Sequence, residues 1–337
     1  MDLFINTPGT AIRQKDGLFL FTAGENKKEI APSRLSRIVM SPSTVVTGQA
    51  IVLAQENNID LVILNHFGEP VGRFWHSKLG RVAVIRRRQL EAATEKLGLK
   101  VAEEFVKVKL SNQASFIKKL AQKRPRIKSD LWERAEAILD LRQKIDQPQR
   151  GTLIEEKRNF IIGLEGMAGR TFFGGLTKVM PDGFKFDGRS RRPARDPFNA
   201  ALNYCYGVMY SLVEQACILA GLDPFVGFVH ADNYGQPSLV FDLIEPFRIY
   251  AEAPCVSLFT GRHIKEEFFD FSPEAVTLNP SGKSIVVQSL NGHLDQKIQY
   301  RRRTLKRFNV IRQEAHRLAA FLYSGDDQAQ MVDVEEF

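Results

Sequence analysis

The chain has 337 residues, of which 44% are hydrophobic and 26% are charged, the balance of a globular protein that can bury a sizeable core. Its net charge of +8 favours an anionic partner, either nucleic acid or an anionic membrane surface. No apolar run approaches the roughly 18 residues that span a bilayer, and the first ten residues lack a signal-peptide pattern, so we expect a cytoplasmic protein with no membrane partner. The three cysteines form no CxxC pair, so nothing suggests a disulfide framework or a thiolate zinc site.

Residues 1–76 alternate short apolar runs with turn residues, which predicts a β-rich domain. Asp16 and Gly17 form a DG turn between two strand-like runs, and the segment 65–70 joins another pair of such runs. Between these two hairpins, residues 43–58 are predicted as one helix capped by Ser43.

After a linker at residues 77–90, the pattern changes to long helix-forming stretches over residues 91–325, predicted as an all-α domain. Its clearest helix begins after Asp196, a capping residue, and stops near Gly221. This helix is apolar on nearly every side, which predicts a buried central position. The fold class is therefore α+β, and the acidic residues 326–337 are predicted to be a disordered tail.

A second predicted helix carries Glu165 beside its apolar stripe, followed by Gly166 and Gly169. The two glycines weaken the helix, so their small size indicates close packing or a use for the space. Taken alone, Glu165 is interpreted as a boundary residue paired with an arginine such as Arg170.

The stretch GFVHADNYGQPSLVFDLIEPFR, residues 227–248, places His230 at the end of one apolar run and Asp242 and Glu245 inside another. If LVFDLIEPFR starts a helix, the two carboxylates share one face. A buried carboxylate needs either an arginine, such as Arg248, or a metal ion. A single histidine of this kind is more often a satisfied core residue than a ligand.

Taken together, these carboxylates and one imidazole make a hard ligand set that suits Mg²⁺ or Mn²⁺. Such an ion can activate a phosphodiester. Basic clusters indicate a track for a DNA or RNA backbone. They lie at residues 86–88, 118–128 and 301–307, and in the loop that carries Arg189, Arg191, Arg192 and Arg195.

The sequence resembles the CRISPR-associated integrase family, the catalytic subunit of the spacer-acquisition complex. The resemblance rests on LEGMAGRTFF around Glu165, on RSRRPARDPFNAALNYCYGVMY at 189–210, and on the stretch 227–248. It extends more weakly to residues 45–74 and 298–322, whereas residues 249–265 depart from the basic helix expected there.

The resemblance implies a β-rich amino-terminal domain and an all-α catalytic domain. It places the metal ligands and catalytic residues on Glu165, His230 and Asp242, with Glu245 at a second acidic position. It implies a Mg²⁺- or Mn²⁺-dependent endonuclease and integrase that inserts spacers into the repeat array, using the 3′-hydroxyl of a DNA fragment. It also implies a homodimer formed by the amino-terminal domain, which assembles with the small second CRISPR-associated protein. Arg189, Arg191, Arg192, Arg195 and Arg248 are candidates for contacts with DNA.

Two other functions fit the same residues. The chain can be a metal-dependent nuclease that cleaves DNA junctions in repair, or a basic DNA-binding protein without enzymatic activity, whose acids only offset its arginines.

Overall fold

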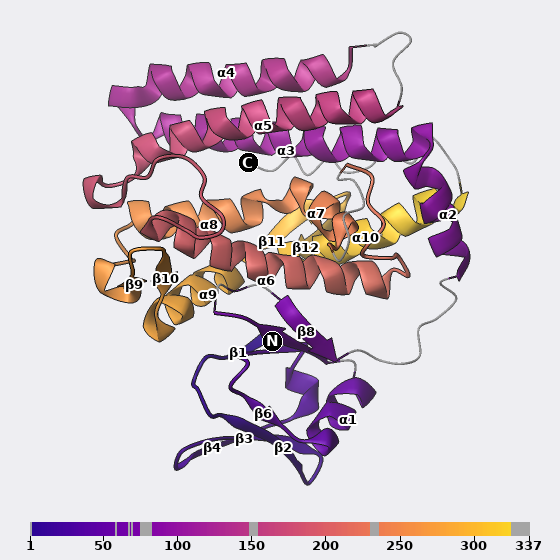
Figure 1. The fold of residues 1–337 in the computed structure, drawn as a ribbon, viewed down its shortest axis with the longest axis vertical. Helices are drawn as coiled ribbons and strands as arrows, with labels where there is room; N and C mark the ends of the chain where they lie inside the picture. The colour runs from indigo at the N-terminus through magenta and orange to yellow at the C-terminus, as the bar shows by residue number, and fades with distance from the viewer. Residues whose placement is uncertain are drawn as a thin grey trace.

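The computed structural model describes residues 2–57, 59–66, 68, 70–74, 83–147, 154–229 and 236–324. Figure 1 shows a small β-rich part that contains the amino terminus and a larger part made of stacked helices. This arrangement confirms the predicted α+β class and the order of its two parts.

The β-rich part contains two four-stranded sheets with the orders β1-β5-β7-β8 and β4-β3-β2-β6. Helix α1 packs against β2 of one sheet and β7 of the other. Ile12, Phe19 and Leu61 are fully buried in the core that the two sheets share. The elements are β1 (Asp2–Ile5), β2 (Ala11–Lys15), β3 (Leu18–Ala23), β4 (Asn26–Ile30), η1 (Pro32–Arg34), β5 (Arg37–Met40), β6 (Val45–Val46), α1 (Gly48–Glu56), β7 (Asp60–Leu64) and β8 (Pro70–Phe74).

Both predicted hairpins are confirmed, because β2 pairs with β3 and β7 pairs with β8 in antiparallel register. Asp16 and Gly17 have φ angles of 51° and 76°, the left-handed conformation that a tight two-residue turn requires. The helix predicted over 43–58 was too long. Val45 and Val46 pair with β2 as a short parallel strand, so α1 begins only at Gly48 and is capped by Thr47, whose side chain accepts from the Ala50 amide.

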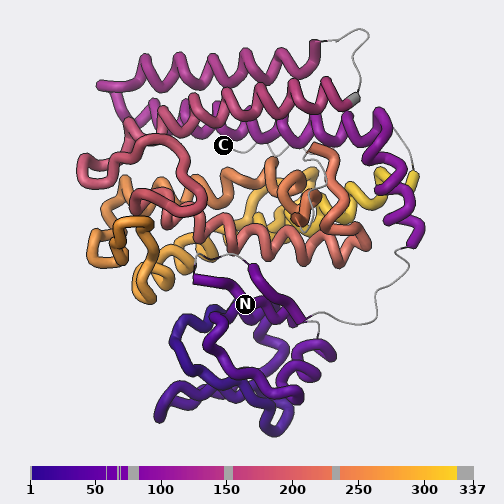
Figure 2. Tube along the Cα trace, in the orientation of Figure 1, coloured from indigo at the N-terminus to yellow at the C-terminus, as the bar shows by residue number. Residues whose placement is uncertain are grey.

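The helical part carries the long helices α3, α4 and α5, which pack against one another, and α6 runs between them and the β-rich part (Figures 1 and 2). Its helices are α2 (Ala83–Ala93), α3 (Lys96–Gln122), α4 (Lys128–Ile145), α5 (Ile154–Val179), α6 (Pro197–Leu219), α7 (Ser238–Leu243), α8 (Ile249–Thr260), α9 (Pro280–Leu294) and α10 (Arg307–Ser324). Short 3₁₀ turns are η2 (Pro125–Ile127), η3 (Asp182–Phe184), η4 (Glu245–Phe247) and η5 (Glu266–Phe268).

Two short antiparallel ribbons interrupt the predicted all-α half. They are β9 (Phe269–Phe271) with β10 (Val276–Leu278), and β11 (Lys297–Tyr300) with β12 (Arg303–Lys306). Arg303 and Lys306 of the basic cluster at 301–307, which lies in the domain predicted as all-α, are therefore in a strand. Helix α2 begins at Ala83, inside the segment predicted as a linker, and the predicted acidic tail lies outside the described residues.

Helix α6 has the ends and the burial that its sequence predicts. The Asp196 side chain caps it by accepting from the Asn199 amide at 2.8 Å, and Gly221 follows it with a φ of 82°. Phe198, Met209 and many other side chains of α6 are buried in the main core. Within the described ranges, every helix is too short or too polar to cross a lipid bilayer.

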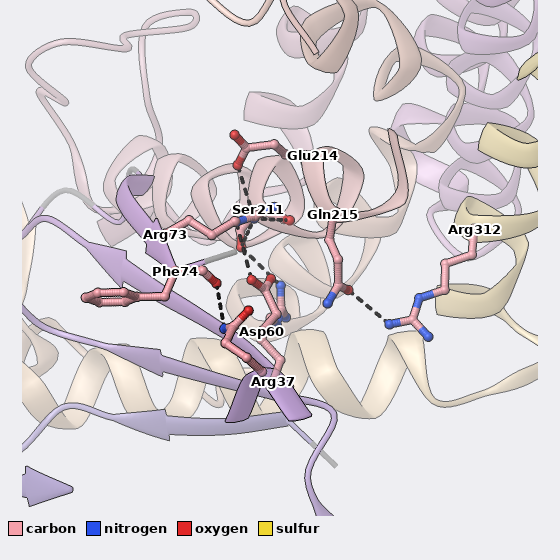
Figure 3. Close-up of polar contacts among 9 residues, drawn as sticks. Arg37, Asp60, Arg73, Phe74, Ser211, Glu214, Gln215 and Arg312 are labelled. Atoms are coloured by element: carbon pink, nitrogen blue, oxygen red, sulfur yellow. Dashed lines mark hydrogen bonds and ion pairs between the residues drawn. The ribbon is translucent and has the colours of Figure 1, made fainter. Parts of the chain in front are cut away.

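A buried polar network joins the first sheet to the middle of α6 (Figure 3). Arg73 of β8 donates to the Ser211 carbonyl oxygen at 2.7 Å and pairs with Glu214 at 3.1 Å and with Asp60 at 3.4 Å. Arg37 of β5 donates to the Ser211 hydroxyl at 3.4 Å. Burial raises the pKa of Asp60, although the neighbouring arginines oppose that rise. The network fixes the sheet against α6 through charged groups that are expensive to separate.

Candidate active site

Three elements bring two glutamates to one lysine. Lys109 lies in α3, Glu165 in α5 and Glu245 at the start of η4. The Lys109 ammonium contacts Glu165 Oε1 and lies 2.5 Å from Glu245 Oε2. The side chains of Lys109 and Glu245 are 5% and 3% exposed, whereas Glu165 is 27% exposed and therefore faces the surface. Glu165 thus pairs with Lys109, and not with Arg170 as the isolated motif indicated.

The chain reaches this geometry because α7 gives way to a 3₁₀ turn at Glu245. Pro246 occupies the first turn of η4, where its missing N–H costs nothing. The Asn112 side chain of α3 donates to the Pro246 carbonyl oxygen at 2.9 Å and so ties this turn to the helix that carries Lys109.

Glu245 is held in its ionised form by two cations. Both Nε and Nη2 of Arg248 donate to Glu245 Oε1, at 2.8 and 2.6 Å. Burial alone would raise the pKa of Glu245, but Arg248 and Lys109 outweigh it and keep that pKa well below its ordinary value. Arg248, predicted as a candidate for DNA or for a local ion pair, therefore makes the ion pair.

Asp242 has a different environment. It is fully buried in α7, and its Oδ2 accepts from the backbone amides of Phe228 and Val229 at 2.5 and 2.8 Å. Gly227 makes this approach possible, because a Cβ there would lie 2.8 Å from the same oxygen. His230 follows Val229 directly and lies outside the described residues. The structure thus ties Asp242 to the backbone that leads into the predicted histidine ligand.

Two further side chains, which the sequence did not single out, bind the backbone of residues 223–229, the segment that follows α6 and leads to His230. Gln89 of α2 donates to the carbonyl oxygens of Asp223 and Val226 at 2.9 and 2.7 Å, and Arg158 of α5 donates to that of Phe228 at 2.8 Å. Gln89 is fully buried, although it directly follows the exposed Arg87 and Arg88 in the sequence. Its role is therefore visible only in the tertiary structure.

A pocket of about 480 Å³ opens beside Glu165. Gly166 and Gly169 line it, so the small residues after Glu165 leave space for it. Its charged and polar walls combine residues from several elements: Lys109, Gln113, Glu165, Arg170, Thr177, Asp187, Arg189, Arg191, Tyr206, Arg248 and Glu252.

The predicted DNA-binding arginines divide into separate groups around this pocket. Arg189 and Arg191 line it, and Arg248 lines it while paired with Glu245. Arg192 and Arg195 are exposed and do not line it.

The site also contains residues that sequence reasoning missed. Tyr206 donates from its hydroxyl to Glu252 Oε1 at 2.6 Å, and burial raises the pKa of Glu252. Glu252 lies in the segment that departs from the family pattern. The signal for Lys109 was a lysine among apolar positions of a long helix, where a buried ammonium requires a carboxylate partner.

The carboxylates fit a divalent ion in donor chemistry. Mg²⁺ and Mn²⁺ prefer oxygen ligands, and Glu165 and Glu245 already converge on one positive charge, the Lys109 ammonium. In the part of the chain that the structure describes, no three His, Cys, Asp or Glu side chains gather as a metal cluster. The set of Glu165, His230 and Asp242 therefore stays a prediction.

Comparison with known proteins identifies the family. Residues 3–292 match the family described as CRISPR associated protein Cas1. The chain is 32% identical over 336 residues to CRISPR-associated endonuclease Cas1 1 of Archaeoglobus fulgidus, covering 96% of both chains.

Solved structures share the fold at lower identity. A casposase bound to integration product superposes with a TM-score of 0.86 at 21% identity, covering 100% of this chain and 94% of that one. A Cas6-RT-Cas1–Cas2 complex gives 0.83 at 19% identity, covering 100% of this chain and 36% of that one. The match over residues 3–292 and the 32% identity to the Archaeoglobus fulgidus protein show that the chain belongs to the Cas1 family of CRISPR-associated proteins.

Proposed function

We propose that this protein is a metal-dependent DNA endonuclease and integrase of CRISPR adaptation, which joins the 3′-hydroxyl of a spacer precursor to a phosphodiester of the repeat array. The observation that carries the proposal is the convergence of Glu165 and Glu245 on Lys109 at the wall of a cationic pocket. Membership in a family whose relatives are named endonucleases supports it, as does the likeness in fold to a casposase bound to integration product.

We propose that Mg²⁺ or Mn²⁺ is bound by Glu165 and His230 together with an acid of the α7–η4 turn. A bound divalent ion would polarise the phosphodiester and lower the pKa of the attacking hydroxyl. Of the two acids, Asp242 is the ligand predicted from the sequence, but the geometry favours Glu245. Glu245 shares a cation with Glu165, whereas Asp242 Oδ2 is occupied by two backbone amides. In this arrangement Asp242 holds the backbone amides of Phe228 and Val229, the two residues that precede His230 in the sequence.

The proposed partners are DNA, a second copy of this chain and the small second protein of CRISPR adaptation, in the cytoplasm. The net charge of +8 and the cationic pocket support DNA. The Cas6-RT-Cas1–Cas2 complex, which shares the fold, supports assembly with Cas2. The homodimer is proposed from the family resemblance alone.

A strand-transfer assay tests the proposal. The purified protein is incubated with its Cas2 partner, Mn²⁺, a supercoiled plasmid that carries a repeat, and a labelled DNA fragment. We expect covalent joining of label to plasmid, abolished by Glu165→Gln and Glu245→Gln. For Asp242→Asn we expect a loss of about 10- to 100-fold, as is usual for residues that orient a ligand.

Glu136→Gln is the matched control, because Glu136 is an exposed glutamate of α4 whose ion pair among the described residues is with Lys118. Cleavage of branched DNA without joining would support a junction nuclease instead. Unchanged activity in Glu165→Gln would rule out the proposed site, and DNA binding with neither reaction would support a non-enzymatic DNA-binding protein.

A further inference from the structure

Arg189 is a partly buried cation in the wall of the pocket that holds Glu165. Its Nη1 donates to the Ser190 carbonyl oxygen at 2.6 Å and to Asn199 Oδ1 at 2.8 Å, and its Nη2 donates to Asn203 Oδ1. The guanidinium carbon lies 5.4 Å from the centre of the Tyr206 ring. All these partners are neutral.

No carboxylate among the described residues forms an ion pair with Arg189, in contrast to Arg248, whose charge Glu245 neutralises. Arg191 and Arg248 instead add positive charge nearby, and burial lowers the pKa of Arg189. A partly desolvated cation without a counter-ion is a cost to the folded protein. The position of this uncompensated charge in the wall of a pocket indicates that an anionic ligand neutralises it.

The frame around Arg189 is itself fixed. Asn199 is fully buried, and its Nδ2 donates to Asp196 Oδ2 at 2.6 Å and to the Gly188 carbonyl oxygen at 2.9 Å. The Asn199 Oδ1 is thereby aimed at the guanidinium, and Asn203, one helical turn further, holds the other nitrogen. Such preorganisation suits planar recognition of an oxyanion.

We propose that Arg189, assisted by Arg191 at the rim, is a receptor for a DNA backbone phosphate next to the phosphodiester that reacts at Glu165. The inference rests on the proposed function, because it takes the pocket ligand to be a DNA strand. Neither arginine forms an ion pair with a described carboxylate, and both line the pocket wall that also contains Glu165. The site would therefore set the register of the strand relative to the carboxylates.

The test compares Arg189→Met with Arg195→Met, since Arg195 is an exposed arginine of the same loop that does not line the pocket. Binding to a fluorescent DNA duplex is measured in EDTA over a series of salt concentrations. For Arg189→Met we expect affinity to fall about tenfold or more and the salt slope to shrink by about 0.9, the value for one phosphate contact. Arg195→Met should change the DNA affinity and the salt slope less than Arg189→Met does.

Thermal stability separates a receptor from a structural arginine. Without DNA, we expect the Tm of Arg189→Met to stay within about 2 °C of wild type, because removal of a desolvated charge without a counter-ion offsets the loss of its three hydrogen bonds. Sulfate should raise the Tm of wild type more than that of the variant. A large fall in Tm, with the DNA affinity and salt slope of the folded fraction unchanged, would overturn the proposal.

Arg189→Lys keeps the charge and removes the fork, so it should retain the salt slope with reduced affinity. If Arg189→Met does not fold, this variant decides, and wild-type affinity in it contradicts the proposal. Metal-free binding is independent of strand transfer, so an inactive wild type that still shows these differences would refute the proposed function and leave the phosphate site standing.

Discussion

Lys109 holds together two acids that would otherwise repel each other. The carboxylates of Glu165 and Glu245 both contact its ammonium, and all three side chains come from different elements. Two carboxylates that contact the same ammonium lie close together, and their mutual repulsion is costly in a site shielded from water. Lys109 therefore compensates the acids in the metal-free protein, and it stands where a divalent ion would compete for the same oxygens.

Replacing this lysine should move two measurable quantities in opposite directions. In Lys109→Met, the metal-free protein should lose about 3 kcal/mol of unfolding free energy, because Glu245 keeps Arg248 but the two glutamates are left with one negative charge in excess. Its affinity for Mn²⁺ should rise, because a competing cation is gone. Thermal melts and calorimetric titration with Mn²⁺ check both, with Lys109→Arg as the variant that keeps the charge. Weaker Mn²⁺ binding in Lys109→Met would show that Lys109 does not compete with the metal ion for the glutamate oxygens.

At the scale of single residues, the sequence could single out Glu165 and Glu245 as candidates but not Lys109, the residue that contacts both of them. Both acids lie in motifs with apolar neighbours, where an unpaired carboxylate is conspicuous. Lys109 lies 56 residues before Glu165, and no local pattern links the two. The same holds for Glu252, which the packing of α8 against α6 brings within hydrogen-bond distance of the Tyr206 hydroxyl.

Elements were predictable where local chemistry sets their ends. Helix α6 has a capping aspartate and a glycine stop, and the β2–β3 hairpin has a DG turn. The short strand β6 and the ribbon β11–β12 were missed, because pairing with a partner strand, and not propensity, defines them.

The contact between β8 and α6 gives a prediction at this scale. Arg73→Met removes the partner of two acids, Asp60 and Glu214, so we expect a loss of about 3–5 kcal/mol in unfolding free energy, measured by urea denaturation. Arg88→Met is the control, because its pair with Glu91 is exposed and should matter by less than about 1 kcal/mol. Equal effects of the two substitutions would show that the sheet does not depend on this network.

For the molecule as a whole, the order of a β-rich part and a helical part followed from the change in sequence pattern near residue 77. The pocket did not follow, because it draws Lys109, Glu165, Arg189 and Arg248 from distant points in the chain. Such convergence depends on how α3, α5 and α6 pack, which hydrophobic periodicity does not specify.

Global stability should depend on pH through Glu314 of α10. This side chain is fully buried, and burial raises its pKa to about 7 although Arg317 opposes the rise. A raised folded pKa gives stability that is complete below the unfolded value near 4.5 and is lost as the pH rises through about 7. The loss for wild type amounts to roughly 3 kcal/mol at most.

Glu314→Gln should lack this loss, so its unfolding free energy relative to wild type should increase between pH 5 and pH 8. Chemical denaturation at several pH values measures the difference, with the exposed Glu136→Gln for comparison. Parallel curves for Glu314→Gln and wild type would show that Glu314 does not titrate in this range.

Helix α6 serves both halves of the molecule. Tyr206 lines the pocket, and Ser211, five residues later and about 7.5 Å further along the axis, accepts hydrogen bonds from the sheet. Because α6 is one continuous helix between these two residues, a shift of the sheet at Ser211 would also move Tyr206. A chimaera that grafts the β-rich part of a relative onto this helical part would therefore disturb the pocket, unless the middle of α6 is exchanged along with the graft.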